Sequence, residues 1–296
     1  MKTIMKKSIA LIVLVAIVAL AFAGCGSNKE GKQADSSNTG NKKVKVINIP
    51  LTQEEYAFGV DKNQPELLEK VNEFVAKIKE DGTFDKILNN YFGDGEPKAV
   101  TSAELDLSKD QLVVATNAEF PPFEYMMGDK YYGVDMEIAE LLAEYLGKEL
   151  VISNMSFDAV CLSVGEGKAD IAMAGLTITE DRKAYVTFSD KYYDAAQMLI
   201  VKADDKTFDN CKTAEDVEAI LKGFGNDVKI GVQGGTTGQF YVEGDPDWGF
   251  EGFNVQCVTY KAGSLAVQDM LNGNINYVII DEAPAQRIVE AINELN

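Results

Sequence analysis

The chain has 296 residues, contains no histidine and carries a formal net charge of −19 at pH 7. This acidic balance argues against nucleic-acid binding, which depends on Lys and Arg side chains that contact phosphates. The lack of histidine removes the commonest general base, the usual zinc ligand and every Ser–His or Cys–His catalytic pair. The four cysteines form no Cys-x-x-Cys motif, so we expect neither a metal site nor a cofactor.

Residues 1–24 have the pattern of a lipoprotein signal peptide. Three lysines precede an apolar run over residues 9–23, and small residues lead up to Cys25. The run is shorter than the roughly 20 residues that a membrane-spanning helix needs, although a simple anchor helix is the alternative. The small residues before Cys25 resemble a bacterial lipobox. This implies that Cys25 is lipidated and holds the protein on the outer face of the cytoplasmic membrane.

Residues 25–43 should form a disordered tether, because they are rich in Gly, Ser, Asn and Lys and lack apolar periodicity. Residues 44–49 and 56–60 then predict two short strands, and a helix is expected from about Pro65 to Lys79. A single apolar stripe marks this helix: Leu67, Leu68, Val71, Phe74, Val75 and Ile78.

A second, shorter helix is expected over residues 84–92 and ends at Gly93. One amphipathic helix cannot bury enough apolar surface by itself, so residues 44–93 must pack on the rest of the chain. Residues 94–110 are polar, contain Pro97 and are expected to form a linker.

From residue 112 the pattern alternates between strands and helices, which predicts an α/β architecture with mostly parallel sheets. Strands are expected at residues 112–116, 150–153, 170–175, 198–202, 228–232, 254–259 and 277–280. Helices are expected at about residues 134–146, 157–165, 213–222, 237–242, 264–272 and 283–294.

The three cysteines after residue 25 give limited information. Cys161 lies on an apolar helix face and is expected to be a small core residue. Cys211 and Cys257 could form a disulfide in an oxidising compartment, but their spacing does not show whether they are close.

Six segments resemble the motifs of polar amino-acid-binding proteins of ABC importers and occur in the same order. They are residues 115–125 (ATNAEFPPFEY), 132–135 (YGVD), 170–182 (DIAMAGLTITEDR), 188–190 (FSD), 231–238 (GVQGGTTG) and 277–282 (YVIIDE). This group of proteins is family 3 of the bacterial extracellular solute-binding proteins. The resemblance implies an α/β fold of the periplasmic-binding-protein-like type II class, with two α/β lobes joined by a two-strand hinge.

The order of the remaining family segments differs in this chain. In the family, a strand, a crossing and a helix follow the part that lies here near Asn296, and they end in a Gly-Thr-Tyr-Asp-like turn and Tyr-Phe-Gly. Similar pieces lie at the other end of this sequence, at residues 51–56 (LTQEEY), 63–68 (NQPELL), 81–85 (DGTFD) and 91–93 (YFG). We therefore interpret the chain as a circular permutant in which residues 94–110 connect the old ends.

A domain swap, in which residues 44–93 complete a neighbouring molecule, is the alternative to closure within one chain. Closure in a monomer is favoured, because a linker of about 17 residues closes a loop at low entropic cost. On this interpretation the first lobe comprises residues 53–201, including the permuted segment 53–93 and the linker. The second lobe comprises residues 202–296 together with residues 44–52.

A buried free amino acid needs partners for both of its charges. The resemblance makes Arg182 the clamp for the α-carboxylate, because a guanidinium can make two parallel bonds to it. Without the resemblance, a surface arginine would be the commoner interpretation. The turn that contains Thr236 and Thr237 precedes a helix and can bind an anion, but it lacks the lysine of a phosphate-binding P-loop. Thr237 is therefore expected to donate its backbone N–H to the carboxylate, with its hydroxyl as a further candidate.

The resemblance places the α-ammonium of the ligand at Asp281, although an isolated Asp at this position would more often cap the helix that follows. The carbonyl of Gly175 and the hydroxyl of Thr177 would complete the ammonium site. Because Arg182 and Asp281 come from opposite lobes, a ligand that bridges them would favour a closed state.

Phe120 and Phe157 match family positions that enclose the ligand side chain, although both could be ordinary core residues. Asn117 stands where relatives often have Asp, and Gln233 stands where Lys is frequent. Neutral groups at both positions favour an uncharged polar side chain on the ligand, although Glu119 could recruit a cation.

The expected function is that of a lipid-anchored extracytoplasmic receptor, not an enzyme. It would bind a free amino acid as a monomer and deliver it to the permease subunits of an ABC importer. A cyclohexadienyl or arogenate dehydratase-like enzyme on the same fold is the alternative, but no second basic motif is present for a more anionic substrate. A sensory ligand-binding module is a third interpretation, which the sequence supports with neither a spanning helix nor an output domain.

Overall fold

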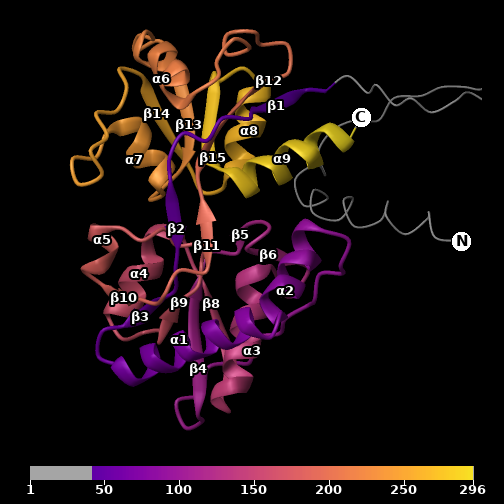
Figure 1. The fold of residues 1–296 in the computed structure, drawn as a ribbon, viewed down its shortest axis with the longest axis vertical. Coiled ribbons are helices and arrows are strands. Elements are labelled where there is room, and N and C mark those ends of the chain that lie inside the picture. Colours follow the sequence, from indigo (N-terminus) through magenta and orange to yellow (C-terminus); the bar gives the residue numbers. More distant parts are fainter. Residues whose placement is uncertain (1–41, 296) are drawn as a thin grey trace, which may run out of the picture.

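The computed structural model describes residues 42–295, which form two α/β lobes stacked along the long axis of the molecule (Figure 1). The expected signal peptide, Cys25 and nearly all of the expected tether lie outside the described residues. Within residues 42–295, no helix combines the length and apolar character that crossing a membrane requires.

The first lobe is built on a five-stranded sheet with the strand order β10-β3-β9-β4-β8. Its strands are β3 (Gly59–Asp61), β4 (Gln111–Thr116), β8 (Glu149–Asn154), β9 (Ile171–Ala172) and β10 (Val186–Phe188). The lobe also contains α1 (Pro65–Glu80), α2 (Thr83–Phe92), α3 (Val134–Leu146), α4 (Phe157–Gly165) and α5 (Glu180–Lys183). A small separate sheet is formed by β5 (Glu119–Phe120), β6 (Glu124–Met127) and β7 (Lys130–Tyr132).

The second lobe is built on a sheet with the order β1-β12-β15-β13-β14. Its strands are β1 (Val44–Ile47), β12 (Gln197–Lys202), β13 (Lys229–Gln233), β14 (Gln256–Tyr260) and β15 (Tyr277–Asp281). Its helices are α6 (Ala214–Lys222), α7 (Thr237–Glu243), α8 (Gly263–Leu271) and α9 (Glu282–Glu294).

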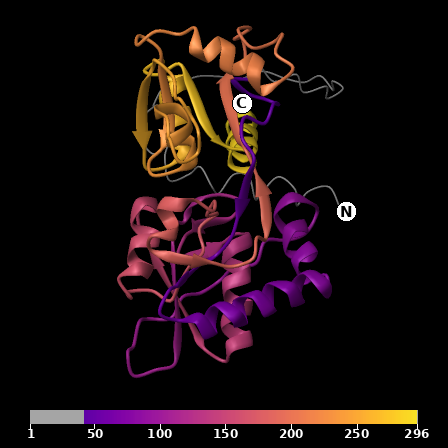
Figure 2. The same ribbon diagram turned by 60° about the vertical axis from the view of Figure 1, so that its left-hand side comes forward.

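Two strands cross between the lobes, and Figure 2 shows them side by side at the junction. They are β2 (Glu54–Tyr56) and β11 (Tyr193–Ala195), which pair antiparallel. The single strand expected at residues 56–60 is instead two short strands, because the chain leaves β11 after Tyr56 and then pairs with β9 and β10 through β3. We did not predict β11.

Both sheets are mixed, so the expectation of mostly parallel sheets was wrong. Strand β4 is parallel to β8 and β9, and β13 is parallel to β14 and β15. One strand of each sheet runs the other way, directly after its crossing: β12 in the second lobe and β3 in the first, each antiparallel to both of its neighbours. The alternation of strands and helices therefore gave the class of the fold but not the direction of these strands.

Residues 44–93 pack on their own chain in the structure. The predicted stripe of α1 is buried, with Leu68 half-buried beside it, and the helix packs against α2 and α3. The hydroxyl of Tyr91 in α2 donates to Glu137 in α3 (2.7 Å) and accepts the backbone N–H of Gly133 (3.0 Å). The first lobe therefore has a continuous core that includes this N-terminal segment.

The expected linker, residues 94–110, is held along the edge of the first lobe, and we call it the strap. The backbone N–H of Ala103 donates to the carbonyl of Leu150 (2.9 Å), and Ser102 Oγ accepts the N–H of Ile152 (2.8 Å). Both partners lie on β8, the last strand of its sheet. The strap therefore covers an edge that would otherwise be open to pairing with another chain.

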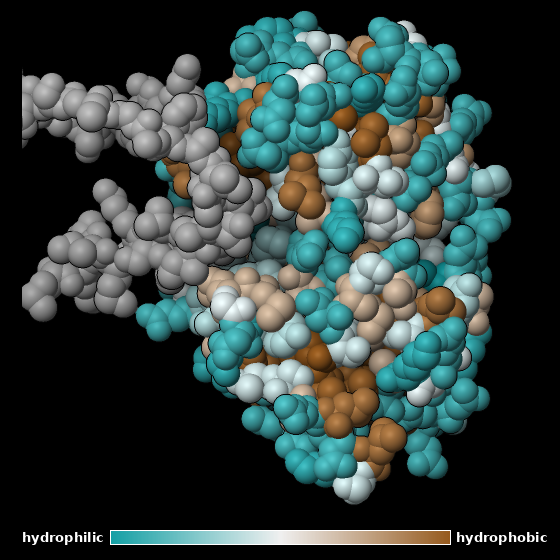
Figure 3. Space-filling view, turned by 180° about the vertical axis from the view of Figure 1, so that it is seen from behind, coloured by the Kyte–Doolittle hydropathy of each residue, from teal (hydrophilic) through white to brown (hydrophobic). Residues whose placement is uncertain are grey.

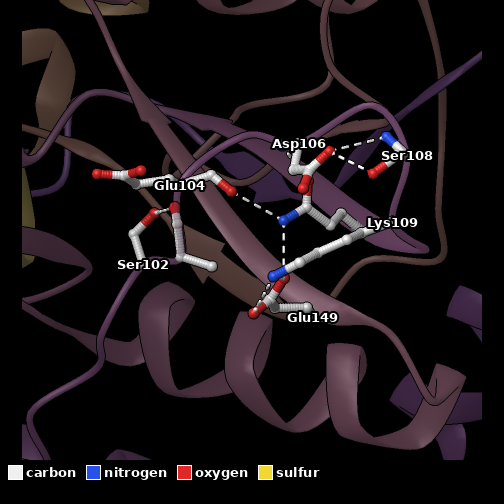
Figure 4. Close-up of polar contacts among 8 residues, drawn as sticks. Ser102, Glu104, Asp106, Ser108, Lys109 and Glu149 are labelled. Atoms are coloured by element: carbon white, nitrogen blue, oxygen red, sulfur yellow. Dashed lines mark hydrogen bonds and ion pairs between the residues drawn. The ribbon is translucent and has the colours of Figure 1, made fainter.

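Polar side chains fix the far end of the strap (Figure 4). The amide of Gln111 donates to the carbonyl of Glu104 (2.9 Å) and to the carboxylate of Glu149 (2.8 Å). Lys109 pairs with the same carboxylate (3.1 Å). Asp106 caps a tight turn by accepting from the N–H and the hydroxyl of Ser108.

The cysteines described by the structure are free thiols. Cys161 is buried in the first lobe, where we expected a core residue. Cys211 and Cys257 pack at the edge of the second-lobe core, and the disulfide that the sequence allowed is not formed. Hydrophilic side chains cover much of both lobes when the molecule is seen from behind, with apolar ones gathered low on the first lobe (Figure 3).

Candidate functional site

A small cavity lies where the two lobes meet. Its lining residues all belong to the set that the sequence analysis proposed: Phe120, Phe157, Gly175, Thr177 and Arg182 from the first lobe, and Thr236, Thr237 and Asp281 from the second. These residues are spread over more than 160 positions of the chain and come together only at the junction of the lobes.

Arg182 lies in the short helix α5, whose N-cap Thr179 accepts the Arg182 backbone N–H (3.1 Å). The guanidinium is buried and donates to the carbonyl of Thr177 (2.7 Å) and, across the junction, to the carbonyl of Gly235 (3.2 Å). Its central carbon lies 5.1 Å from the centroid of the Phe157 ring.

Arg182 forms no ion pair with any carboxylate of residues 42–295, because none of these carboxylates lies within 4.0 Å of its guanidinium. Neutral carbonyls satisfy part of the hydrogen-bonding capacity of an arginine but do not balance its charge. A buried positive charge in this arrangement favours an anion in the cavity.

Asp281 lies at the end of β15 and is buried. Its carboxylate accepts the hydroxyl of Tyr56 from the crossing strand β2 (2.6 Å). Asp281 occupies the N-cap position of helix α9, as the alternative interpretation expected, but its side chain makes no capping hydrogen bond there. Burial and the nearby negative charge of Glu54 raise the pKa of Asp281 to about 7.

Glu54 was missed by the sequence analysis, although it is one of the most connected side chains at the junction. It is buried on β2 and accepts four hydrogen bonds, two on each carboxylate oxygen. The donors are the hydroxyl of Thr52 (2.7 Å) and the amide of Gln197 (3.0 Å) on Oε1, and the hydroxyls of Thr177 (2.7 Å) and Thr237 (2.8 Å) on Oε2.

The strand pattern held a signal for Glu54. Alternate residues of a strand face the same side, so Glu54 shares the buried side of β2 with Tyr56, while Glu55 is exposed. In a run of only three strand residues with two adjacent glutamates, this alternation was too short to single out either one.

Asn117 and Gln233 are not among the cavity-lining residues. They bond to each other across the lobes, with the amide of Gln233 donating to Asn117 Oδ1 (3.0 Å). Asn117 also donates to the carbonyl of Met155 (2.7 Å). Both side chains are buried and join the two lobes beside the cavity.

Two further buried acids lie behind the cavity in the first lobe. Asp135 accepts the backbone N–H of Gly175 (2.9 Å) and the hydroxyl of Tyr192 (2.7 Å), and burial raises its pKa to about 7. Glu124 is fully buried, and burial raises the pKa of its carboxyl well above the usual range. The hydrogen bond that Asp135 accepts from the N–H of Gly175 fixes this peptide, and the φ of +53° at Gly175 suits glycine.

No group of three or more Cys, Asp and Glu side chains in the described part of the chain is arranged to hold a metal ion. The site is therefore made of one cation, buried acids, hydroxyls and two aromatic rings. Such a set can bind a small molecule that carries both an anionic and a cationic group.

Residues 4–94 and 112–288 match the bacterial extracellular solute-binding proteins, family 3. The chain is 38% identical over 96 residues to the arginine-binding extracellular protein ArtP of Bacillus subtilis (strain 168), which covers 32% of this chain and 38% of ArtP. It is 30% identical over 176 residues to the ABC transporter arginine-binding protein 1 of Escherichia coli (strain K12), covering 59% of this chain and 64% of that protein. The matched regions thus span less than two thirds of these relatives.

Solved structures share the fold. An ancestral arginine-binding protein bound to arginine superposes with a TM-score of 0.52 and 34% identity, covering 62% of this chain and 74% of that one. The same kind of protein bound to glutamine gives a TM-score of 0.51 and 33% identity, with the same coverage. Holo ArgBP from T. maritima gives a TM-score of 0.51 and 35% identity, covering 61% and 73%.

The family match extends over most of the chain, and the fold agrees with it. The chain therefore belongs to the bacterial extracellular solute-binding proteins, family 3, and is a solute-binding protein rather than an enzyme.

Proposed function

We propose that this chain is an extracytoplasmic receptor that binds a free amino acid between its lobes and delivers it to the permease subunits of an ABC importer. One observation carries the proposal: the buried Arg182, without an acidic partner among the described residues, shares a cavity with Asp281 from the opposite lobe. A zwitterion supplies a carboxylate for Arg182 and an ammonium for Asp281, so each buried charge gains a partner. The name of the E. coli relative, an arginine-binding protein of an ABC transporter, supports the ligand class and the importer.

The proposed roles of the other lining residues follow from this placement. The backbone N–H of Thr237 joins Arg182 at the α-carboxylate, with Thr236 beside it. The carbonyl of Gly175 and the hydroxyl of Thr177 join Asp281 at the α-ammonium. Phe120 and Phe157 enclose the ligand side chain.

We further propose that the ligand has an uncharged polar side chain. Arg182 and Asp281 are the ionisable side chains that line the cavity, and both are assigned to the α-groups of the ligand. Asn117 and Gln233, the neutral pair beside the cavity, would act on the side chain through the closed junction rather than by lining the cavity. The ancestral protein solved with glutamine shows that a related site accepts such a side chain.

A thermal-shift panel tests the function and the side-chain class together. The full chain is heated with each of the twenty standard amino acids and with cystine. The proposal expects the largest shift for a polar uncharged amino acid. A largest shift for arginine or histidine would overturn the side-chain class only, whereas no shift with any of them would overturn the proposed function.

We also propose that the chain is a circular permutant that closes within a monomer. Residues 51–93 resemble segments that follow the 277–282 motif in the family, and the family match skips residues 95–111, which form nearly all of the strap. The hydrogen bonds from the strap to β8 support a short, ordered connection. Light scattering over a hundredfold dilution should give a monomer throughout, and a dimer that loses amino-acid binding on dilution would indicate a swap.

The proposed anchor is a lipid on Cys25. The described chain enters at β1 in the second lobe, where the N–H of Lys43 donates to Asn293 of α9 (2.8 Å), so the tether would hold this lobe nearer the membrane (Figure 1). Mass spectrometry of the mature protein should find a diacylglyceryl group on Cys25. A chain recovered from the medium with an unmodified Cys25 would contradict the anchor.

A further inference from the structure

Glu54 links the crossing strand β2 to both lobes beside the cavity. It lies on crossing strand β2 and accepts from Thr177 of the first lobe, Thr237 of the second lobe and Gln197 at the start of β12. With a fourth donor from Thr52, both of its oxygens are fully engaged and its exposed fraction is only 4%. A carboxylate in this setting acts only as an acceptor.

The two threonine hydroxyls have one proton each, and both protons are committed to Glu54. The hydroxyl of Thr177 donates to Oε2, so it can offer a ligand only its lone pairs. The hydroxyl of Thr237 donates to the same oxygen and also accepts from the amide of Gln197 (2.9 Å). Neither hydroxyl is free to donate to a ligand carboxylate.

The two threonine hydroxyls donate toward a part of the site that contains two acids, Glu54 and Asp281. Tyr56 donates to Asp281, and the negative charge of Glu54 contributes to the raised pKa of Asp281, so the two acids lie close enough to interact. This side of the cavity therefore presents acceptors and negative charge, and the described donors point away from the cavity toward the acids.

We propose that Glu54 is a positioning residue that makes the site select an α-ammonium. By holding the Thr177 hydroxyl as an acceptor beside Asp281, it favours a protonated amine and disfavours the α-hydroxy and α-keto acids of the same side chain. Those acids offer the site at most one proton, and none in the keto form, so they leave buried acceptors unpaired. This inference rests on the proposed function and assigns the ligand carboxylate to Arg182 and to backbone N–H groups.

The substitution Glu54→Gln tests the proposal, because the amide has protons to give and reverses the direction of at least one of its hydrogen bonds. Calorimetry would compare L-glutamine and L-arginine with their α-hydroxy analogues on the wild-type chain and on the variant. We expect the wild type to bind each amino acid at least 100-fold more tightly than its α-hydroxy analogue. Glu54→Gln should lower this affinity ratio at least tenfold, because it weakens binding of the amino acid. Glu55→Gln is the matched control, since Glu55 is exposed and pairs with Lys191 (2.6 Å), and it should leave the ratio unchanged.

A second pair of variants keeps the test decisive if Glu54→Gln does not fold. Thr177→Val removes the oriented hydroxyl and should lower the ratio, whereas Thr177→Ser keeps it and should not. A ratio that stays unchanged in Thr177→Val, or an equal loss for amino and hydroxy acids in Glu54→Gln, would reduce Glu54 to a structural link between the lobes and overturn the inference. A wild-type chain that binds none of the panel amino acids would instead overturn the proposed function beneath it.

Discussion

The two ends of the cavity balance their buried charges in different ways. At one end, Arg182 donates to two neutral carbonyls, those of Thr177 and Gly235, and no acid of residues 42–295 neutralises it. At the other end, Asp281 has a hydroxyl donor in Tyr56 and a second acid, Glu54, close by. An arginine cannot lose its proton in a protein, whereas a buried aspartate can gain one.

Only the Asp281 end of the site can therefore change its charge when no ligand is bound. The unliganded protein can neutralise Asp281 by protonation, but Arg182 stays charged at every accessible pH. The carboxylate of a ligand therefore meets a fixed charge, and its ammonium meets one that depends on pH.

Replacing the fixed charge should have the largest effect. Arg182→Ala is expected to weaken binding of the best amino acid in the panel by about 3–5 kcal/mol, roughly 150- to 4,500-fold, because the ligand carboxylate is left buried without a partner. Arg182→Lys keeps the charge but loses the bidentate geometry, so its affinity should lie between those of the wild type and Arg182→Ala. Calorimetry measures all three, and less than tenfold weakening in Arg182→Ala would contradict the assignment.

Replacing Asp281, whose charge depends on pH, should weaken ligand binding somewhat less than replacing Arg182. Asp281→Asn is expected to weaken binding by about 2–4 kcal/mol, because the amide oxygen still accepts from the ammonium but without the charge. The same change removes a buried acid, so the unliganded protein should unfold at a higher temperature. Asp194→Asn, at an exposed residue paired with Lys191, is the control for both measurements. If Asp281→Asn left affinity unchanged, the ammonium would have to lie elsewhere.

The raised pKa of Asp281, about 7, gives affinity and stability opposite dependences on pH. Below pH 7 the unliganded carboxyl holds a proton that an ammonium must displace, so affinity should fall by up to tenfold per pH unit. An unfolded aspartate has a pKa of about 3.9, so between about pH 4 and 7 the folded state holds a proton that the unfolded state has lost. The free energy of unfolding of the unliganded protein should therefore decrease as pH rises through this window.

Asp135, with a pKa also raised to about 7 by burial, contributes to the stability trend in the same direction. It accepts only from groups of the protein, so it should not affect the affinity trend. Calorimetry from pH 5 to 8 measures how affinity depends on pH, and thermal unfolding over the same range measures how stability does. Asp281→Asn should make affinity independent of pH, whereas stability should keep the part of its pH dependence that comes from Asp135. An affinity that is constant from pH 5 to 8 in the wild type would show that binding does not require deprotonation of Asp281.

The sequence predicted the parts of the fold that depend on local pattern. The apolar stripe of α1 and the α/β alternation after residue 112 were confirmed, because burial of a helix face follows from spacing alone. The reversed directions of β3 and β12 were not predictable in this way. They depend on where the chain crosses between the lobes, and the three residues of β3 carry little pattern.

The candidate site shows the same division. The residues that line the cavity came from motifs that resemble those of a family, and the structure brings them together. Glu54 lies in the family-like segment 51–56, but the resemblance assigned it no role, and its importance lies in donors from positions 52, 177, 197 and 237. Only the folded chain assembles that set, so the residue pattern alone was too short to distinguish Glu54 from Glu55.

The smallest predicted effect concerns the single hydroxyl that acts on the Asp281 end. Tyr56→Phe removes the donor to Asp281, so the ionised carboxylate loses one hydrogen bond and the pKa of the unliganded Asp281 should rise further. We expect affinity at pH 7 to fall by about 1 kcal/mol, roughly fivefold, and the midpoint of the affinity curve to move to higher pH. Tyr193→Phe is the matched control, because its ring lies 5.8 Å from that of Tyr56 on the other crossing strand. Equal effects of the two substitutions would indicate that ring packing, and not the hydroxyl, matters at this end of the cavity.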